Sequence, residues 1–190
     1  MIVSKFLYAF YYLYSKIRYR NILEFKEYLF NSDKNKKIHS YLESAYLKRM
    51  SKMGFSIGYT AKFIGAPLFP HGLNGIFISG KSVIGRNCTI YQQVTIGSNL
   101  LIDSKHKGTP VIGDNVFIGA GAMIIGNVTV GNNCRIGANA VVAKDIPDNT
   151  IVVPQMNYIQ RDTPLDNYYY VEKGERLYRY EDAKLVEAPK

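Results

Sequence analysis

Of the three histidines in the chain, His71 is the one best placed for acid–base chemistry. An unperturbed imidazole titrates near neutral pH, so it can take the proton from a hydroxyl group as the oxygen attacks a carbonyl carbon. His71 stands at the entrance to a regular repeat, whereas His39 falls in a predicted helix far from that repeat in sequence. His106 lies in a segment that interrupts the repeat. We therefore take His71 as the candidate general base and His106 as a second candidate.

The repeat returns an aliphatic residue at every sixth position, apart from one break. Its members are Ile78, Ile84, Ile90, Ile96, Ile112, Ile118, Ile124, Val130, Ile136 and Val142. The fourth residue after most of them is small or apolar, as at Ser82, Cys88, Val94, Val116, Ala122, Val128, Cys134, Ala140 and Ile146. A period of six fits neither a helix nor a single strand, and it is typical of a parallel β-helix in which three short strands make one coil of about 18 residues.

One interruption of the repeat points to a functional loop. The step from Ile96 to Ile112 is 16 residues, which is not a multiple of six, so a segment must leave the coil. We expect residues 98–110 to form this excursion loop. Loops of that length inside a compact repeat are uncommon and are often functional.

The two cysteines are predicted to be core residues and not a disulfide pair. Cys88 and Cys134 both occupy the inward fourth position of the repeat, where a small apolar side chain is needed. Free buried thiols are consistent with a reducing cytoplasm, which is the location we expect.

The repeat is flanked by segments of a different kind. Residues 1–52 have apolar positions three or four apart, as at Phe6, Phe10, Leu13 and Ile17, which predicts two or three helices. Residues 53–157 form the predicted β-helix. In the tail, 158–190, two alternating runs around Lys173-Gly174 predict a β-hairpin. We read the apolar start of the chain as a helix and not as a secretory signal, and no run is long enough to span a membrane.

Positive charge is concentrated near the amino terminus. The whole chain carries a net charge of +9, and residues 1–50 hold ten Lys or Arg against four Asp or Glu. Such basic, tyrosine-rich helices could contact an anionic glycan or an acidic membrane surface, or they could simply present a solvated face and pack their aromatic side chains on the coils. No nucleic-acid-binding motif accompanies the charge, so we expect no nucleic-acid partner.

These motifs resemble those of the hexapeptide-repeat acyltransferases. The segment His71-Gly-Leu-Asn-Gly-Ile-Phe-Ile-Ser-Gly followed by Gln92-Gln-Val-Thr-Ile-Gly is similar to the serine-acetyltransferase-like branch, and Lys107-Gly-Thr-Pro-Val-Ile-Gly-Asp is closer to its polysaccharide-modifying members. The resemblance covers roughly residues 54–161. It implies a mainly β fold, a left-handed parallel β-helix, and a homotrimer that binds acetyl-CoA in the groove between neighbouring prisms.

The resemblance also implies roles for individual residues. His71 matches the catalytic histidine, and His106 lies where related enzymes place a second histidine, although its spacing to Val111-Ile-Gly-Asp is longer here. The residues that match coenzyme A contacts are Ala120, Ala138, Ala143, Lys144 and Arg161. Lys144 would be a phosphate partner, and the alanines would let the pantetheine arm lie close to the backbone.

Two departures from the pattern lead us to expect a sugar acceptor. Serine acetyltransferases carry acidic residues just before the catalytic histidine and about fifteen positions upstream, where this chain has Pro70 and Ser56. Without those carboxylates the ammonium group of an amino acid would lose its partner. We therefore predict O-acetylation of a capsular or exopolysaccharide sugar or its precursor. The segment Val152-Val-Pro-Gln-Met-Asn-Tyr also departs from the family's usual closing sequence at the adenine end of the cofactor site.

Three alternatives stay open at this point. The first is serine O-acetylation, and the second is a non-catalytic scaffold in which the basic helices bind a partner or a membrane. The third is a metal-dependent hydratase with the same prism, which needs three histidines on one zinc ion. The spacing of His39, His71 and His106 does not favour that third reading, so we expect no metal.

Overall fold

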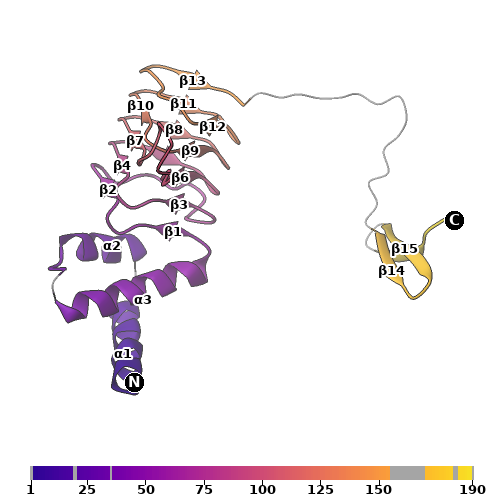
Figure 1. Cartoon of the computed structure of the whole chain (residues 1–190), viewed down its shortest axis with the longest axis horizontal. Helices are drawn as coiled ribbons and strands as arrows, with labels where there is room; N and C mark the ends of the chain where they lie inside the picture. Colours follow the sequence, from indigo (N-terminus) through magenta and orange to yellow (C-terminus); the bar gives the residue numbers. More distant parts are fainter. Residues whose placement is uncertain (1, 19–20, 35, 155–169, 182–183, 190) are drawn as a thin grey trace. The chain divides into compact units, whose positions relative to one another are not determined.

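The computed structural model confirms the parallel coil and the amino-terminal helices (Figure 1). It describes residues 2–18, 21–34, 36–154, 170–181 and 184–189. The helices and the coils form one compact unit, and a small carboxy-terminal sheet forms a second one. No helix among these residues is long and apolar enough to cross a membrane.

Three parallel sheets form the sides of a triangular prism. The first holds β1 (Ser56–Ile57), β3 (Phe77–Ile78), β6 (Thr95–Gly97), β9 (Met123–Ile125) and β12 (Val141–Val142). The second holds β2 (Lys62–Phe63), β4 (Val83–Ile84), β7 (Val111–Ile112) and β10 (Thr129–Val130). The third holds β5 (Thr89–Ile90), β8 (Phe117–Ile118), β11 (Arg135–Ile136) and β13 (Ile151–Val152). Sequential strands therefore belong to successive sides.

The six-residue repeat fills the inside of this prism. All ten aliphatic residues of the repeat are buried, and so are all the predicted fourth positions except Ile146, which is half-buried. Neighbouring side chains in a strand point to opposite faces, so Thr95 and Phe117 face outward beside Ile96 and Ile118. The coils extend beyond the regular repeat at both ends. Before the repeat, β1 pairs with β3, and after it, β13 pairs with β11.

The prism has three edges, where one sheet passes to the next. At the first, which we call the histidine edge, the chain leaves the third sheet for the first through residues 69–76, 91–94, 119–122 and 137–140. At the loop edge it leaves the first sheet for the second through residues 79–82, 98–110, 126–128 and 143–146. The asparagine edge carries Asn87, Asn115, Asn133 and Asn149, all with positive φ.

The asparagine edge shows how the coils are locked together. The amide of Asn87 donates to Asn115 at 2.8 Å, and Asn115 donates to Asn133 at 2.9 Å. Asn133 donates to Asn149 at 3.2 Å. Asparagine tolerates the left-handed backbone conformation of these corners. Its side-chain amide forms a hydrogen bond to the asparagine side chain in the next coil. This edge is therefore a structural ladder.

Both cysteines lie inside the prism with free thiols, as predicted. The Cys134 thiol donates to the Pro147 carbonyl oxygen, with 3.1 Å between sulfur and oxygen, and Cys88 donates to Gly113 at 3.3 Å. Burial raises the pKa of the Cys88 thiol. Both thiols are buried inside the prism, so neither is exposed for nucleophilic chemistry.

Three helices lie at the end of the prism beside β1, and the first of them packs on the third (Figure 1). They are α1 (Ile2–Arg18), α2 (Ile22–Asn31) and α3 (Lys37–Met53). Phe25 and Leu29 from α2 and Tyr46 from α3 join the same buried cluster as Ile57 of β1. The Tyr46 hydroxyl donates to the Ile57 carbonyl oxygen at 2.8 Å, and burial raises the pKa of Tyr46. Aromatic residues of α2 and α3 thus extend the core of the coils.

The carboxy-terminal unit is a small antiparallel sheet. Its strands are β14 (Tyr170–Lys173), β15 (Arg176–Glu181) and β16 (Lys184–Glu187). β14 and β15 pair around Gly174, whose φ of +63° suits a tight turn. The hairpin forms at the residues where the alternating pattern predicts it, and β16 adds a third strand that the pattern did not indicate.

Two adjacent residues of β7 test the inside–outside pattern. We expect Ile112→Ala to lower the free energy of unfolding by about 2–5 kcal/mol, because it leaves a cavity in the prism. Val111→Ala should change it by less than about 1 kcal/mol, because Val111 faces outward. Urea unfolding followed by circular dichroism would measure both. Equal effects of the two substitutions would contradict the assigned register.

Candidate active site

His71 lies at the histidine edge, in the segment that leads into β3. Leu68 pairs with Thr89 on the third sheet, and Phe77 begins a strand of the first, so residues between them turn the corner. The side-chain amide of Asn74 donates to the His71 carbonyl oxygen at 3.1 Å. This contact fixes the backbone of a short turn, and the imidazole is left exposed at the surface.

The imidazole is oriented by Gln92, which lies one coil further along the same edge. The distance from His71 Nδ1 to Gln92 Oε1 is 2.7 Å. An amide oxygen only accepts hydrogen bonds, so Nδ1 must carry the proton in this arrangement. The lone pair of the neutral ring is then on Nε2, which is the atom available as a base.

Two aromatic side chains form a wall beside the imidazole. The Tyr91 ring meets His71 edge to face, with 5.2 Å between ring centroids. Phe117 lies on the other side of Tyr91, at 5.1 Å between centroids. Tyr91 packs against one side of the His71 ring. Together, the two aromatic rings form an apolar border to the site.

Ala120 and Ala138 follow His71 along the same edge. The backbone N–H of Asn139 donates to the Ala120 carbonyl oxygen at 2.9 Å. The backbone N–H of Gly121 donates to the backbone carbonyl oxygen of Gln92 at 3.0 Å. The stacking is close: a Cβ on Gly119 would come within 2.6 Å of the Ala138 nitrogen. Small residues therefore continue from His71 up the edge, where an extended ligand could lie against the backbone.

His106 lies on a different edge of the prism. The excursion loop leaves after β6 and returns before β7, and reciprocal backbone hydrogen bonds of 2.9 Å between Asn99 and Gly108 close its neck. The Asn127 amide donates to the His106 carbonyl oxygen at 2.9 Å, and a Cβ on Gly126 would come within 2.7 Å of that oxygen. The loop edge holds His106 in place, and the imidazole is exposed.

Ala143 and Lys144 share the loop edge with His106. They follow β12, and the chain then pairs Ile146 with Val130 on the second sheet. A hollow of about 470 Å³ lies beside the neck of the excursion loop, with Lys81 and Lys107 among its lining residues. This edge is therefore basic. Arg161 lies outside the residues that the structure describes.

The structure thus divides the predicted site residues into two groups. His71, Ala120 and Ala138 share the histidine edge, whereas His106, Ala143 and Lys144 share the loop edge. The first sheet lies between the two edges within one copy. Within the described residues, no group of three or more His, Cys, Asp or Glu side chains is placed to hold a metal ion.

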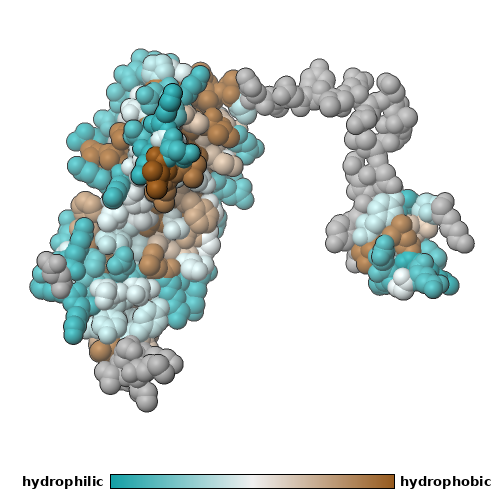
Figure 2. All heavy atoms as spheres, viewed as in Figure 1, coloured by the Kyte–Doolittle hydropathy of each residue, from teal (hydrophilic) through white to brown (hydrophobic). Residues whose placement is uncertain are grey.

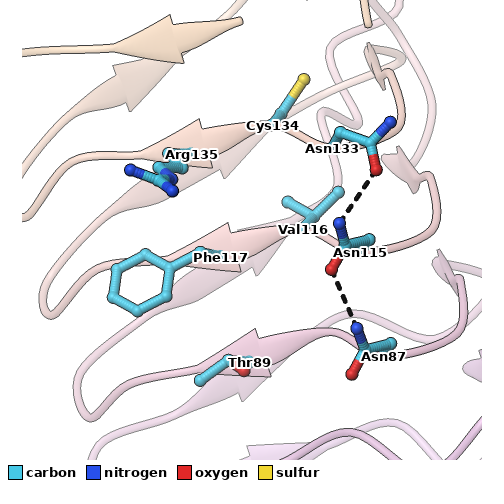
Figure 3. Close-up of a pocket in the computed structure, with 8 residues that line it drawn as sticks. All are labelled: Asn87, Thr89, Asn115, Val116, Phe117, Asn133, Cys134 and Arg135. Carbon is cyan, nitrogen blue, oxygen red and sulfur yellow. Dashed lines mark hydrogen bonds between the residues drawn. The ribbon is translucent and has the colours of Figure 1, made fainter. Parts of the chain in front are cut away.

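The pocket drawn in Figure 3 contains none of the predicted site residues. It measures about 400 Å³ and lies between the asparagine ladder and the outer face of the third sheet, where Phe117 and Arg135 project (Figure 3). Its asparagines are hydrogen-bonded to one another, and the buried Cys134 faces the core. No lining residue is a base of the kind that His71 provides.

Sequence reasoning missed the contribution of Gln92 and Tyr91. Both belong to the motif that supports the resemblance, but no spacing rule pairs a residue with another 21 positions earlier. The available signal was the period of the coil itself. Residues about one coil apart are stacked, so the corner after Ile90 had to face the turn that carries His71.

Comparison with known proteins connects this geometry to a group of enzymes. Residues 109–144 match the family described as bacterial transferase hexapeptide (six repeats). Over 118 residues the chain is 42% identical to a serine acetyltransferase of Staphylococcus epidermidis, covering 60% of this chain and 53% of that one. A serine acetyltransferase of Mycobacterium tuberculosis is 41% identical over 90 residues, covering 47% and 38%.

Solved structures give the same result. Neisseria gonorrhoeae serine acetyltransferase in complex with serine superposes with a TM-score of 0.59 at 28% identity, covering 70% of this chain and 53% of that one. Soybean serine acetyltransferase complexed with serine gives 0.58 at 28% identity, covering 70% and 54%. The chain thus spans about half the length of the relatives it matches, or less.

These relatives overturn the prediction of a polysaccharide acceptor. The prediction rested on Pro70 and Ser56, which replace acidic residues, yet the similar proteins are serine acetyltransferases. A missing carboxylate at two positions does not exclude an amino acid, because carbonyl oxygens and aromatic faces also bind ammonium groups. The matched segment, residues 109–144, is similar to the hexapeptide repeat of the bacterial transferases, and His71 lies outside that segment.

Proposed function

We propose that the chain is an acetyl-CoA-dependent O-acetyltransferase that acts on the hydroxyl group of L-serine. The observation that carries this is the exposed His71 imidazole, whose Nδ1 is held by Gln92 at 2.7 Å on an edge lined by small residues. The serine acetyltransferases among its relatives support the choice of acceptor. The match to the hexapeptide family and to these folds also supports a left-handed coil.

His71 would act as the base in the transfer. Its Nε2 takes the proton from the serine hydroxyl as the oxygen forms a bond to the acetyl carbon. The carbon–sulfur bond then breaks, and the imidazolium returns the proton to the departing sulfur. The Gln92 amide oxygen accepts from Nδ1–H throughout, which keeps the ring oriented. Such a base contributes about 10²–10⁴-fold to the rate.

The histidine edge fits the acyl donor. When bound, acetyl-CoA supplies the thioester as the activated acetyl group. The small side chains of Ala120 and Ala138 would leave room for a narrow chain beside the backbone of this edge. The basic residue Lys144 lies on the other edge, so it can reach a phosphate group of the same ligand only from a neighbouring copy.

The division between the edges supports a homotrimer. A site with contributions from both edges needs the histidine edge of one copy against the loop edge of the next. Such a head-to-tail contact repeats, and three copies close it into a ring. The exposed Leu100, Leu101 and Ile102 at the tip of the excursion loop give the loop edge apolar surface for that contact.

Substitution of the base tests the proposed reaction. We expect His71→Ala to lower turnover with L-serine by at least about 10²-fold, because the hydroxyl loses its proton acceptor. Release of the coenzyme A thiol measures the rate, and circular dichroism checks that the fold is intact. Full activity of a folded His71→Ala variant would refute His71 as the base. Absence of turnover on L-serine by the unaltered protein would refute the acceptor.

Variants of Gln92 test the orientation of the ring. Gln92→Glu places a carboxylate beside Nδ1, which favours the imidazolium, so the acid limb of the pH–rate profile should move to higher pH. Gln92→Leu should lower kcat by about five- to tenfold through loss of one hydrogen bond. Steady-state rates across pH measure both effects. An unmoved profile in Gln92→Glu would contradict the contact.

Mixed trimers test the shared site. His71→Ala disables the histidine edge, and a double variant with His106→Ala and Lys144→Ala disables the loop edge. When the two are refolded together in equal amounts, about a quarter of the sites join an intact edge from each and regain activity. Native mass spectrometry confirms the mixing. Mixed trimers without recovered activity, or a mass near one subunit in light scattering, would contradict a site between copies.

A further inference from the structure

The coils contain only four acidic side chains, and three of them bind one coil to another. Between residues 54 and 154 the acidic residues are Asp103, Asp114, Asp145 and Asp148. Asp114 Oδ1 accepts from the backbone N–H of Arg86 at 2.7 Å. Asp145 and Asp148 each accept from a backbone N–H of the preceding coil, also at 2.7 Å. These three carboxylates therefore belong to the scaffold, because each forms a charge-assisted hydrogen bond between coils.

Asp103 is the exception among the four. It lies in the excursion loop with its side chain exposed, and it takes part in none of the hydrogen bonds or ion pairs found in the described parts of the chain. The segments of the histidine edge contain no acidic residue. Asp103 is therefore the carboxylate of the described coils that is available to bind a cation.

Two consecutive β-turns carry Asp103. The backbone N–H of Ser104 donates to the Leu101 carbonyl oxygen at 3.3 Å, and the backbone N–H of Lys107 donates to the Ser104 carbonyl oxygen at 3.2 Å. The side-chain amide of Asn99 donates to the Ser104 hydroxyl oxygen at 2.8 Å, which ties both turns to the neck of the loop. The loop's own hydrogen bonds thus give Asp103 an ordered support.

The excursion loop and the His71 imidazole lie at matching heights along the prism. Gln92, which contacts His71, lies in the corner before β6, and the loop leaves directly after β6. The contact from Asn127 to the His106 carbonyl oxygen is one coil further on. In the proposed ring of parallel prisms equal heights are level, so the loop edge of one copy would bring Asp103 to the level of His71 in the next.

We propose that Asp103 of one copy binds the ammonium group of the acceptor amino acid at the His71 site of the neighbouring copy. This rests on the proposed function, and it assigns a partner to the ammonium group although Pro70 and Ser56 replace acidic residues. A carboxylate forms a charge-assisted hydrogen bond with an ammonium group, which is stronger than a bond from a neutral carbonyl or amide oxygen.

The charges of the loop edge fit a zwitterion. Serine brings one carboxylate and one ammonium group to the site. The carboxylate could meet any of three lysines on this edge, Lys81, Lys105 and Lys107, whereas the ammonium group has Asp103 alone among the unengaged carboxylates of the described coils. Removing Asp103 should therefore affect recognition of the ammonium group selectively.

Apolar residues beside Asp103 would strengthen the contact. Leu100, Leu101 and Ile102 precede Asp103 directly and are exposed. Hydrophobic residues also form patches beside hydrophilic ones on the visible face of the coils (Figure 2). When a neighbouring copy covers the tip of the loop, water leaves the surroundings of Asp103. The attraction between its carboxylate and a bound ammonium group then increases, because the local dielectric constant falls.

Steady-state kinetics of the full-length protein test the proposal. We expect Asp103→Asn to raise KM for L-serine by about tenfold or more and to leave kcat within about twofold, because the base and the acyl donor are unchanged. Competitive inhibition by 3-hydroxypropanoate, which is serine without its ammonium group, should be equal in variant and unaltered protein. Asp103→Glu should recover part of the lost affinity, because it restores the charge.

Asp114→Asn is the matched control. It removes a carboxylate from the same prism, but an amide oxygen can still accept from Arg86, so KM for L-serine should stay unchanged. An unchanged KM in Asp103→Asn would overturn the inference and leave the proposed function standing. Equal weakening of 3-hydroxypropanoate and L-serine would also overturn it, because the loop itself would then be disturbed. Absence of turnover on L-serine by the unaltered protein would refute the proposed function, and the inference with it.

Mixed trimers show which copy supplies Asp103. When His71→Ala and Asp103→Asn are refolded together in equal amounts, about a quarter of the sites join an intact histidine edge to an intact loop. Those sites should regain the KM of the unaltered protein for L-serine. A mixture that shows only the raised KM would contradict binding by the neighbouring copy.

Discussion

The hydrogen bonds between successive coils are the constraint on which the rest of this structure depends. Each strand inside a sheet pairs with the strands above and below it, so no coil can rotate or shift without breaking the register of its neighbours. The corners are bound by the same requirement, as the ladder from Asn87 to Asn149 shows. A chain built in this way holds every outward residue at a fixed height and on a fixed side.

This rigidity explains how one imidazole can be positioned by residues that are distant in sequence. His71 and Gln92 meet because the turn before β3 and the corner before β6 are stacked on one edge. The same stacking places Ala120 and Ala138 further along that edge, and it keeps His106 and Lys144 on another. The geometry of a single prism therefore separates groups that the proposed chemistry uses together, and association between copies is what would reunite them.

Much of the fold could be predicted because each position in the six-residue repeat corresponds to one position in the packed prism. Ile78, Ile84 and Ile90 differ by six positions because each fills the same interior layer from a different side. The break before Ile112 gave the excursion loop for the same reason. The first coil was harder to delimit, since Ser56 and Lys62 begin strands in an imperfect repeat. His71 was selected by residue type and stays a prediction, whereas its contacts with Gln92 and Tyr91 depend on which corners are stacked. The acceptor was predicted wrongly. Pro70 and Ser56 show that two carboxylates are absent, but they do not show which other groups could bind the ammonium group of an amino acid.

The neck of the excursion loop has a consequence for how such a protein can change. Asn99 and Gly108 are joined by two backbone hydrogen bonds, so the chain re-enters the prism at the same point whatever lies between them. Insertions or deletions within residues 100–107 would leave the interior layers undisturbed. Selection could therefore replace this segment and alter the surface of the loop edge, while the prism beneath it is kept.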